Sequence, residues 1–124
     1  MSNATLIKNF TAEAAMTANR IVKIGANDGG VLPAAASTDI LLGAVADVAA
    51  ASGERQDVIL SGIADITLGG NVTRGNPVTS DASGRAVNAN PAAGVNAYIV
   101  GFALQSGVSG DIVPVLLSQG RVQG

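Results

Sequence analysis

Short runs of β-branched residues separated by glycine-containing turns are the feature of this sequence that most constrains its fold. The runs occupy residues 20–24, 39–45, 57–68, 76–79, 85–87, 97–104 and 111–117. Runs of this length and spacing are typical of all-β barrels and sandwiches, because helices need longer periodic segments. We therefore predict an all-β fold, a small β-barrel or β-sandwich built from short strands.

Proline and alanine modify this pattern locally. Pro114 lies inside the last run, where it removes one backbone donor from the ladder, so that run is predicted to be an edge strand or to contain a bulge. The alanine tracts at 33–37 and 48–52 have a helical composition but lie between proline or glycine residues and are too short to be stable alone. We expect loops or single helical turns there.

The first 19 residues differ from the rest, because they contain both methionines and no glycine. A short helix over residues 11–18 is one interpretation. We favour an extended arm, in which Leu6, Ile7 and Phe10 need an apolar surface to pack against. The predicted organisation is an N-terminal arm over residues 1–19 and a single β-rich domain over residues 20–124.

The two halves of the chain contain a weak repeat, which suggests an internal duplication. "VKIGANDGGV" at 22–31 matches "VTSDASGRAV" at 78–87, and both segments are predicted to be hairpins. Further along, Gly43 matches Gly101, and residues 57–60 match the run at 111–117. The offset between matches drifts, so no regular solenoid is expected. Chance similarity in a chain rich in glycine, alanine and valine is the alternative.

The charge content is low and argues against nucleic-acid binding. Charged residues make up 13% of the chain, the net charge is −2, and the seven basic residues are scattered singly. A nucleic-acid interface normally needs a basic patch together with stacking aromatic side chains. We expect no direct nucleic-acid contact. A surface with so little charge is typical of a protein covered by partners or by copies of itself.

Catalysis and metal binding have few candidate residues. The chain contains no cysteine and no histidine, which removes thiol nucleophiles, imidazole bases and most transition-metal ligands. Asp28 and Asp81 lie in the matched turns, where aspartate normally bonds nearby backbone N–H groups. Asn27 and Asp28 alone are too few oxygen ligands for calcium. We predict no enzyme, no metal and no cofactor.

Carrier domains and membrane proteins also fit poorly. A lipoyl or biotinyl carrier needs a lysine at an exposed hairpin tip, whereas Lys8 lies in the arm and Lys23 lies within a predicted strand. The one uncharged segment long enough to span a membrane, residues 86–110, contains asparagine, proline and glycine, which disfavour insertion. No signal peptide is visible. We expect synthesis in the cytoplasm of a cell and no membrane contact.

The order of these segments resembles the capsid cement, or head decoration, proteins of tailed bacteriophages and prophages. The arm "TLIKNFTA", the hairpin "ANRIVKIGANDGGV" and the later "VTRGNPVTSDASGRAV" and "YIVGFALQSGVSGDIVPVLL" are similar to that family. The resemblance implies a small β-rich virion protein that binds the outer face of the assembled head and stabilises it. It also implies a homotrimer whose partner is the major capsid protein.

Within that resemblance, Leu6, Ile7 and Phe10 are the predicted contacts of the arm with the major capsid protein or a neighbouring subunit. Arg74 and Arg85 are further candidate contacts, facing either solvent or the capsid. One alternative is another self-assembling phage module, of the head-fibre or tail-tube type. The other is a small-ligand-binding β-domain, although a chain without tryptophan and with one tyrosine offers little for sugars to stack on.

Overall fold

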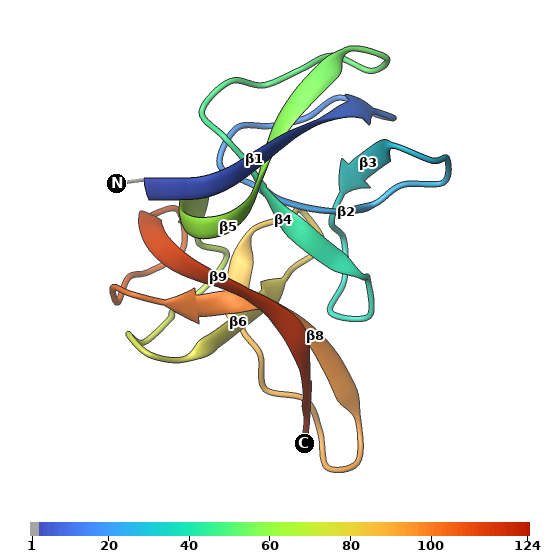
Figure 1. The fold of residues 1–124 in the computed structure, drawn as a ribbon. Helices are drawn as coiled ribbons and strands as arrows, with labels where there is room; N and C mark the ends of the chain where they lie inside the picture. The colour runs from blue at the N-terminus through green and yellow to red at the C-terminus, as the bar shows by residue number, and fades with distance from the viewer. Residues whose placement is uncertain (1–2) are drawn as a thin grey trace.

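The computed structural model describes residues 3–124, and this part of the chain is all-β without a helix, as the sequence predicts (Figure 1). Its strands are β1 (Asn3–Ala12), β2 (Ile21–Ile24), β3 (Gly30–Pro33), β4 (Leu41–Val45), β5 (Arg55–Thr67), β6 (Pro77–Ser80), β7 (Ala86–Asn88), β8 (Asn96–Ala103) and β9 (Ile112–Gln123). The described chain accordingly has no helix that could cross a membrane. The alanine-rich segments after β3 and β4 are loops.

The strands form one mixed sheet in the order β1-β3-β2-β4-β5-β9-β8-β6-β7, and β1 also pairs with β5. This additional pairing closes β1, β3, β2, β4 and β5 into a ring, whereas the remaining strands continue from β5 (Figure 1). The architecture is therefore a partly closed sheet and not a clean barrel. Residues 1–2 of the predicted arm lie outside the described part, and residues 3–12 form β1.

Strand order supports the predicted duplication. The series β3-β2-β4-β5 in the first half is mirrored by β7-β6-β8-β9 in the second. Both matched segments are antiparallel hairpins, β2–β3 and β6–β7. Pairing registers agree as well, because Val22 pairs with Gly43 and Val78 pairs with Gly101.

The last match of the repeat is correct in the strands that it joins and wrong in register. Ala44 of β4 pairs with Ile59 of β5, and the equivalent Phe102 of β8 pairs with Leu116 of β9. Ile59 is therefore equivalent to Leu116. The sequence match had implied that Ile59 is equivalent to Val113. Similar β-branched residues at neighbouring positions of both strands conceal this shift at the level of sequence.

The matched glycines have the same structural role. A Cβ at Gly43 would overlap the carbonyl oxygen of Ile59, and a Cβ at Gly101 would overlap the carbonyl oxygen of Leu116. In both places the backbone of one strand approaches the neighbouring strand so closely that no side chain fits. The repeat in sequence thus reflects a repeated backbone contact.

Pro114 does not make β9 an edge strand, because β9 lies between β5 and β8. The carbonyl oxygen of Pro114 accepts a hydrogen bond from the Leu104 N–H at 3.0 Å, so its missing donor faces the end of β8 and not β5. The predicted bulge is not in this run either, because the pairing of residues 112–117 of β9 with β5 and β8 is regular. The β8–β9 register shifts only between Ile99 and Gly101. That irregularity lies further along β9 than Pro114.

Two clusters of buried side chains hold the sheet. The larger cluster joins both halves and contains residues such as Ile21, Ile66, Val100 and Val115. The smaller cluster lies within the ring and is formed by Ala12, Met16, Val22, Val31, Val45 and Val58. Because Ala12 of β1 is fully buried there, the end of the predicted arm is part of the core. The boundary at residue 19 stays a prediction.

Asn19 forms hydrogen bonds with the backbone of β5 beyond Ile63, where the pairing with β1 has ended. Its carbonyl accepts from the Thr67 N–H at 2.8 Å, and its side-chain amide donates to the Asp65 carbonyl at 3.2 Å. Asn19 has a φ of 60°, the one positive φ of a non-glycine residue in the part of the chain that the structure describes. Asparagine tolerates this left-handed conformation better than most residues do.

The close approach at Gly101 gives a direct test of the fold. Gly101→Ala should lower the free energy of unfolding by about 3 kcal/mol or more, because the new Cβ meets backbone that cannot move without breaking the β8–β9 ladder. Gly120→Ala is the matched control on β9, since an added Cβ there meets nothing within 4 Å. Urea denaturation followed by circular dichroism measures both; equal stability of the two variants would contradict the register described above.

Candidate functional site

The outer edge of β1 is an open sheet edge. One edge of the strand pairs with β5 from Asn3 to Thr11. The other edge pairs with β3 at Thr11 and Ala12, and no described strand pairs with residues 3–10 on that side. Such an edge presents unpaired backbone groups that can accept an added strand.

The predicted contacts of the arm lie on this strand but divide into two kinds. Leu6 and Ile7 are about half exposed, at 53% and 52%, and the β1–β5 register shifts on both sides of Leu6. Phe10 instead packs against the buried cluster inside the ring, and the Lys8 ammonium lies 5.5 Å from the centre of its ring. Leu6 and Ile7 are thus available to a partner, whereas Phe10 mainly attaches β1 to its own core.

A shallow hollow of about 360 Å³ lies beside the exposed Ile7. It extends from Ile7 and Asn9 to the loop at 46–49, where Val48 is 71% exposed, and to the first residues of β5. Its polar side is ordered, because the Arg55 guanidinium donates to Asn9 and Thr11. Ile7 and Val48 are large, exposed apolar residues of its lining.

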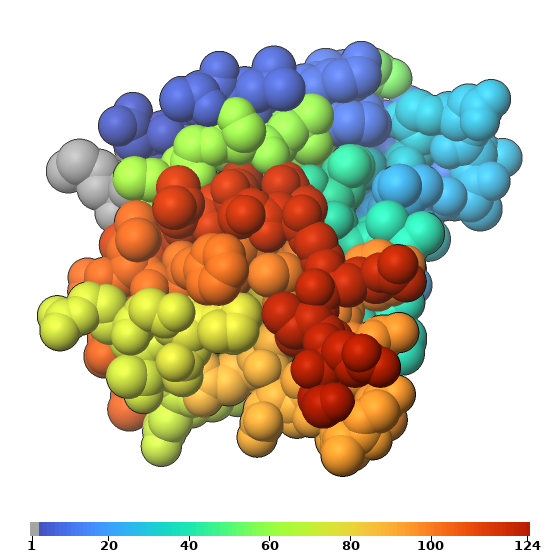
Figure 2. All heavy atoms as spheres, turned by 60° about the horizontal axis from the view of Figure 1, so that its bottom comes forward, coloured from blue at the N-terminus to red at the C-terminus, as the bar shows by residue number. Residues whose placement is uncertain are grey.

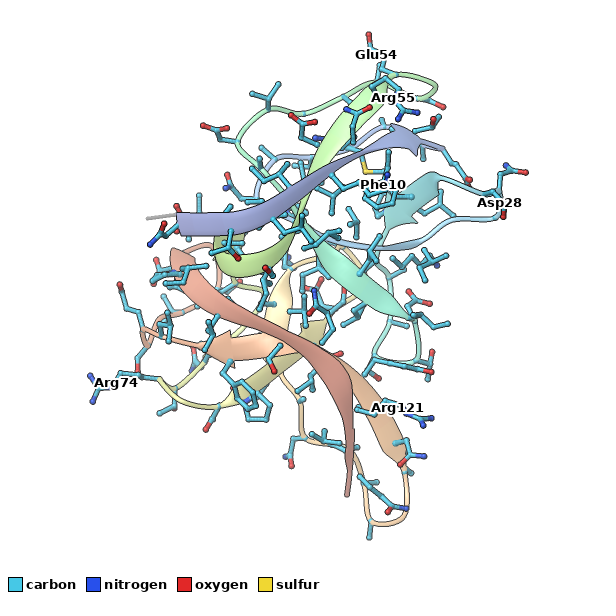
Figure 3. All side chains as sticks on the ribbon, in the orientation of Figure 1. Phe10, Asp28, Glu54, Arg55, Arg74 and Arg121 are labelled. Carbon is cyan, nitrogen blue, oxygen red and sulfur yellow. The ribbon has the colours of Figure 1, made fainter. Side chains whose placement is uncertain are left out.

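The candidate arginines lie elsewhere. Arg74 points away from the molecule at the opposite end from Arg55 (Figure 3), and its backbone N–H donates to the Ser106 hydroxyl. Arg85 forms an ion pair with Asp81 at 3.1 Å within the β6–β7 hairpin. The structure therefore does not bring Arg74 together with the β1 edge, and it gives Arg85 a partner in its own turn.

A second exposed surface was not anticipated from the sequence. Seven apolar residues lie on the outward side of β5, β9, β8 and β6, and we call this surface the outer apolar face: Ile63, Pro77, Phe102, Leu104, Ile112, Pro114 and Leu116. Direct pairing places Ile63, Leu116, Phe102 and Pro77 in one row across the four strands. The exposed fractions of Ile112 and Leu116 are 54% and 44%.

Figure 2 shows the order of strands across this side, with β1 in blue, β5 in green, β9 in red, β8 in orange and the β6 region in yellow. The alternation of Ile112, Pro114 and Leu116 along β9 was the available sequence signal. It was obscured because the intervening Val113, Val115 and Leu117 are also apolar, so residues 112–117 have no polar side.

Comparison with known proteins identifies the family. A family model described as phage cement protein matches residues 1–117, nearly the whole chain. The chain belongs to the phage cement protein family. The resemblance inferred from the sequence is confirmed, and membership implies a structural component of the phage virion. No curated protein matches the sequence.

Among solved structures, this chain is similar to the N base of the head fiber protein gp8.5 of bacteriophage phi29. The TM-score is 0.70 at 18% identity, and the match covers 96% of this chain and 98% of that chain. At this level of identity the likeness concerns the fold alone. The partly closed sheet is thus an architecture that the two chains share.

Several acidic residues of this chain organise turns. Asp81 accepts from the backbone N–H groups of Ser83 and Arg85, as predicted for its turn. Asp39 and Asp111 accept backbone N–H groups in the same way, although neither was assigned this role from the sequence. In the described part of the chain, no group of three or more acidic residues is arranged to hold a metal ion.

Glu13 joins the end of β1 to the β2–β3 hairpin. Its two carboxylate oxygens accept the backbone N–H groups of Ala26 and Asn27 at 2.7 and 2.9 Å. These hydrogen bonds, that from Ala26 first, hold the pKa of the Glu13 carboxyl below its ordinary value of 4.5. A Cβ at Gly30 would overlap this carboxylate, so a side chain there would displace Glu13 from its hydrogen bonds.

A folded-state pKa below the unfolded value means that ionised Glu13 stabilises the fold above pH 4.5 and that this contribution disappears as the pH falls through the lowered pKa. Glu13→Gln should therefore melt at a lower temperature than the wild type at pH 7, and the difference should shrink as the pH is lowered below 4.5. Thermal melts between pH 7 and pH 3 measure this. Asp47→Asn, which removes the same charge from an exposed loop, is the control; a wild-type advantage that is independent of pH would contradict the assignment.

Proposed function

We propose that this cement protein attaches to the outer surface of the assembled phage head and stabilises the shell. Its partner in this proposal is the major capsid protein. The observation that carries the proposal is the open outer edge of β1 with the exposed side chains of Leu6 and Ile7 beside it. The protein acts without catalysis, which agrees with acidic side chains that bond backbone groups within their own turns.

Strand addition is the mode of attachment that fits this edge. An extended capsid segment pairs with the free backbone groups of β1, and the main-chain hydrogen bonds provide affinity. Side chains of that segment provide specificity through Ile7 and the hollow next to it. The ordered Arg55 side chain keeps the polar side of the hollow fixed, so a partner does not have to order it on binding.

Weak contacts of this kind are sufficient on a symmetric shell. A head presents many equivalent sites, so linked copies of a small protein bind with an avidity far above the affinity of each contact. Each bound copy also connects shell segments that would otherwise separate under the pressure of packaged DNA. Stabilisation therefore follows from occupancy and needs no chemical step.

The attachment site is tested by replacing the exposed side chains and not by deleting the strand, because Ala12 is part of the core. The double variant Leu6→Lys, Ile7→Lys should bind undecorated heads roughly thirtyfold more weakly, since it removes two half-buried apolar contacts and adds charge. Occupancy on purified heads, measured by sedimentation and gel densitometry, and the heat resistance of the decorated heads give the two readouts.

Val108→Lys is the control, because Val108 is 55% exposed in a loop outside the proposed site. It should bind heads as the wild type does. Full occupancy by the Leu6, Ile7 double variant, with an unchanged circular dichroism spectrum, would rule out the β1 edge as the attachment site.

A second candidate function is the base of a head fibre. The observation in its favour is the similarity of fold to the N base of the head fiber protein of phi29 over almost the whole length of both chains. Negative-stain images of decorated heads separate the two possibilities. Compact particles on the shell support a cement protein, whereas projecting fibres, contributed by further domains or partners, support a fibre base.

A further inference from the structure

We infer that the outer apolar face is the surface through which copies of this chain pack against one another. The inference rests on the proposed function, in which the protein binds an already assembled head. It assigns the self-contact to β5, β9, β8 and β6 and leaves the β1 edge for the capsid.

The composition of this face is unusual for a sheet side that faces water. An antiparallel sheet with one buried side normally alternates apolar and polar residues, so that its outward side is polar. Here the inward residues Val113 and Val115 belong to the core, and the outward residues Ile112, Pro114 and Leu116 are apolar too. A contiguous exposed apolar surface of this kind marks an interface.

Charge favours a second copy as the occupant. The seven residues of the outer apolar face carry no charge, and Asp65, the acidic residue of β5 on the same side, is partly buried. Two copies, each with a net charge of −2, repel least when they meet at an uncharged surface. Depletion of charged residues is also characteristic of the centre of self-associating interfaces.

The order of events points to the same occupant. A cement protein folds before it meets the head, so a face reserved for the capsid would remain exposed to water until attachment. Other copies of the chain are present from synthesis onward and can cover the face at once. Phe102 is suited to the centre of the contact, because Leu116 and Pro77 flank it directly and aromatic side chains dominate such centres.

The oligomeric state of the free protein tests this inference without heads. Size-exclusion chromatography with light scattering should give the wild type a mass that is a multiple of 12.2 kDa, near threefold if the family resemblance extends to assembly. Ile112→Lys and Leu116→Lys should each shift the protein to 12.2 kDa at micromolar concentration while keeping the β-sheet circular dichroism spectrum. Ile112, at 54% exposure, provides the variant with the least effect on folding.

Ile24→Lys is the matched control, because Ile24 is 52% exposed on the ring, away from the outer apolar face. It should keep the wild-type mass. A monomeric wild type, oligomers that survive both substitutions in folded protein, or dissociation caused by Ile24→Lys would each overturn the inference. None of these results depends on head binding, which the Leu6, Ile7 double variant tests separately.

Discussion

Strand β5 is the constraint on which the rest of the structure depends, because both halves of the sheet are built on it. Along one edge it pairs with β1 and is then covered by Asn19. Along the other edge it pairs first with β4 at Val58 and Ile59, and then with β9 from Ile63 to Thr67. Gly62 lies where the partner changes, and its φ of 96° is a conformation that side chains strongly disfavour. The ring and the outer part of the sheet therefore share one continuous strand.

The same arrangement separates two exposed surfaces by direction. The open edge of β1 is a border of the sheet, whereas the outer apolar face is one side of β5, β9, β8 and β6. A strand can thus be added to β1 while a second copy lies against β9. For a member of the phage cement family, this geometry allows one small domain to contact both the shell and its own copies.

The sequence supports the all-β class, the hairpins and the repeat because each depends on local chemistry: turns at Asp28 and Asp81, and a glycine within a strand at Gly43 and Gly101. The outer apolar face depends on strand pairing between segments far apart in the chain. Residues 112–117 of β9 are apolar on both sides, so the sequence does not show which of them face outward. The packing of Phe10 on the core of its own chain could not be predicted from the sequence either. An apolar residue in an extended arm has the same sequence pattern whether it packs on its own core or on a partner.

The pairing of β1 with β5 has a mechanical consequence. Hydrogen bonds of an antiparallel ladder lie perpendicular to the strands. A pull along β1 therefore loads the bonds from Asn3 to Thr11 together and in shear, whereas a pull at a hairpin tip opens bonds one at a time. Because β5 continues directly into the pairing with β9, that load passes along a single strand from one end of the domain to the other. The series β1-β5-β9 therefore resists tension that is directed along β5.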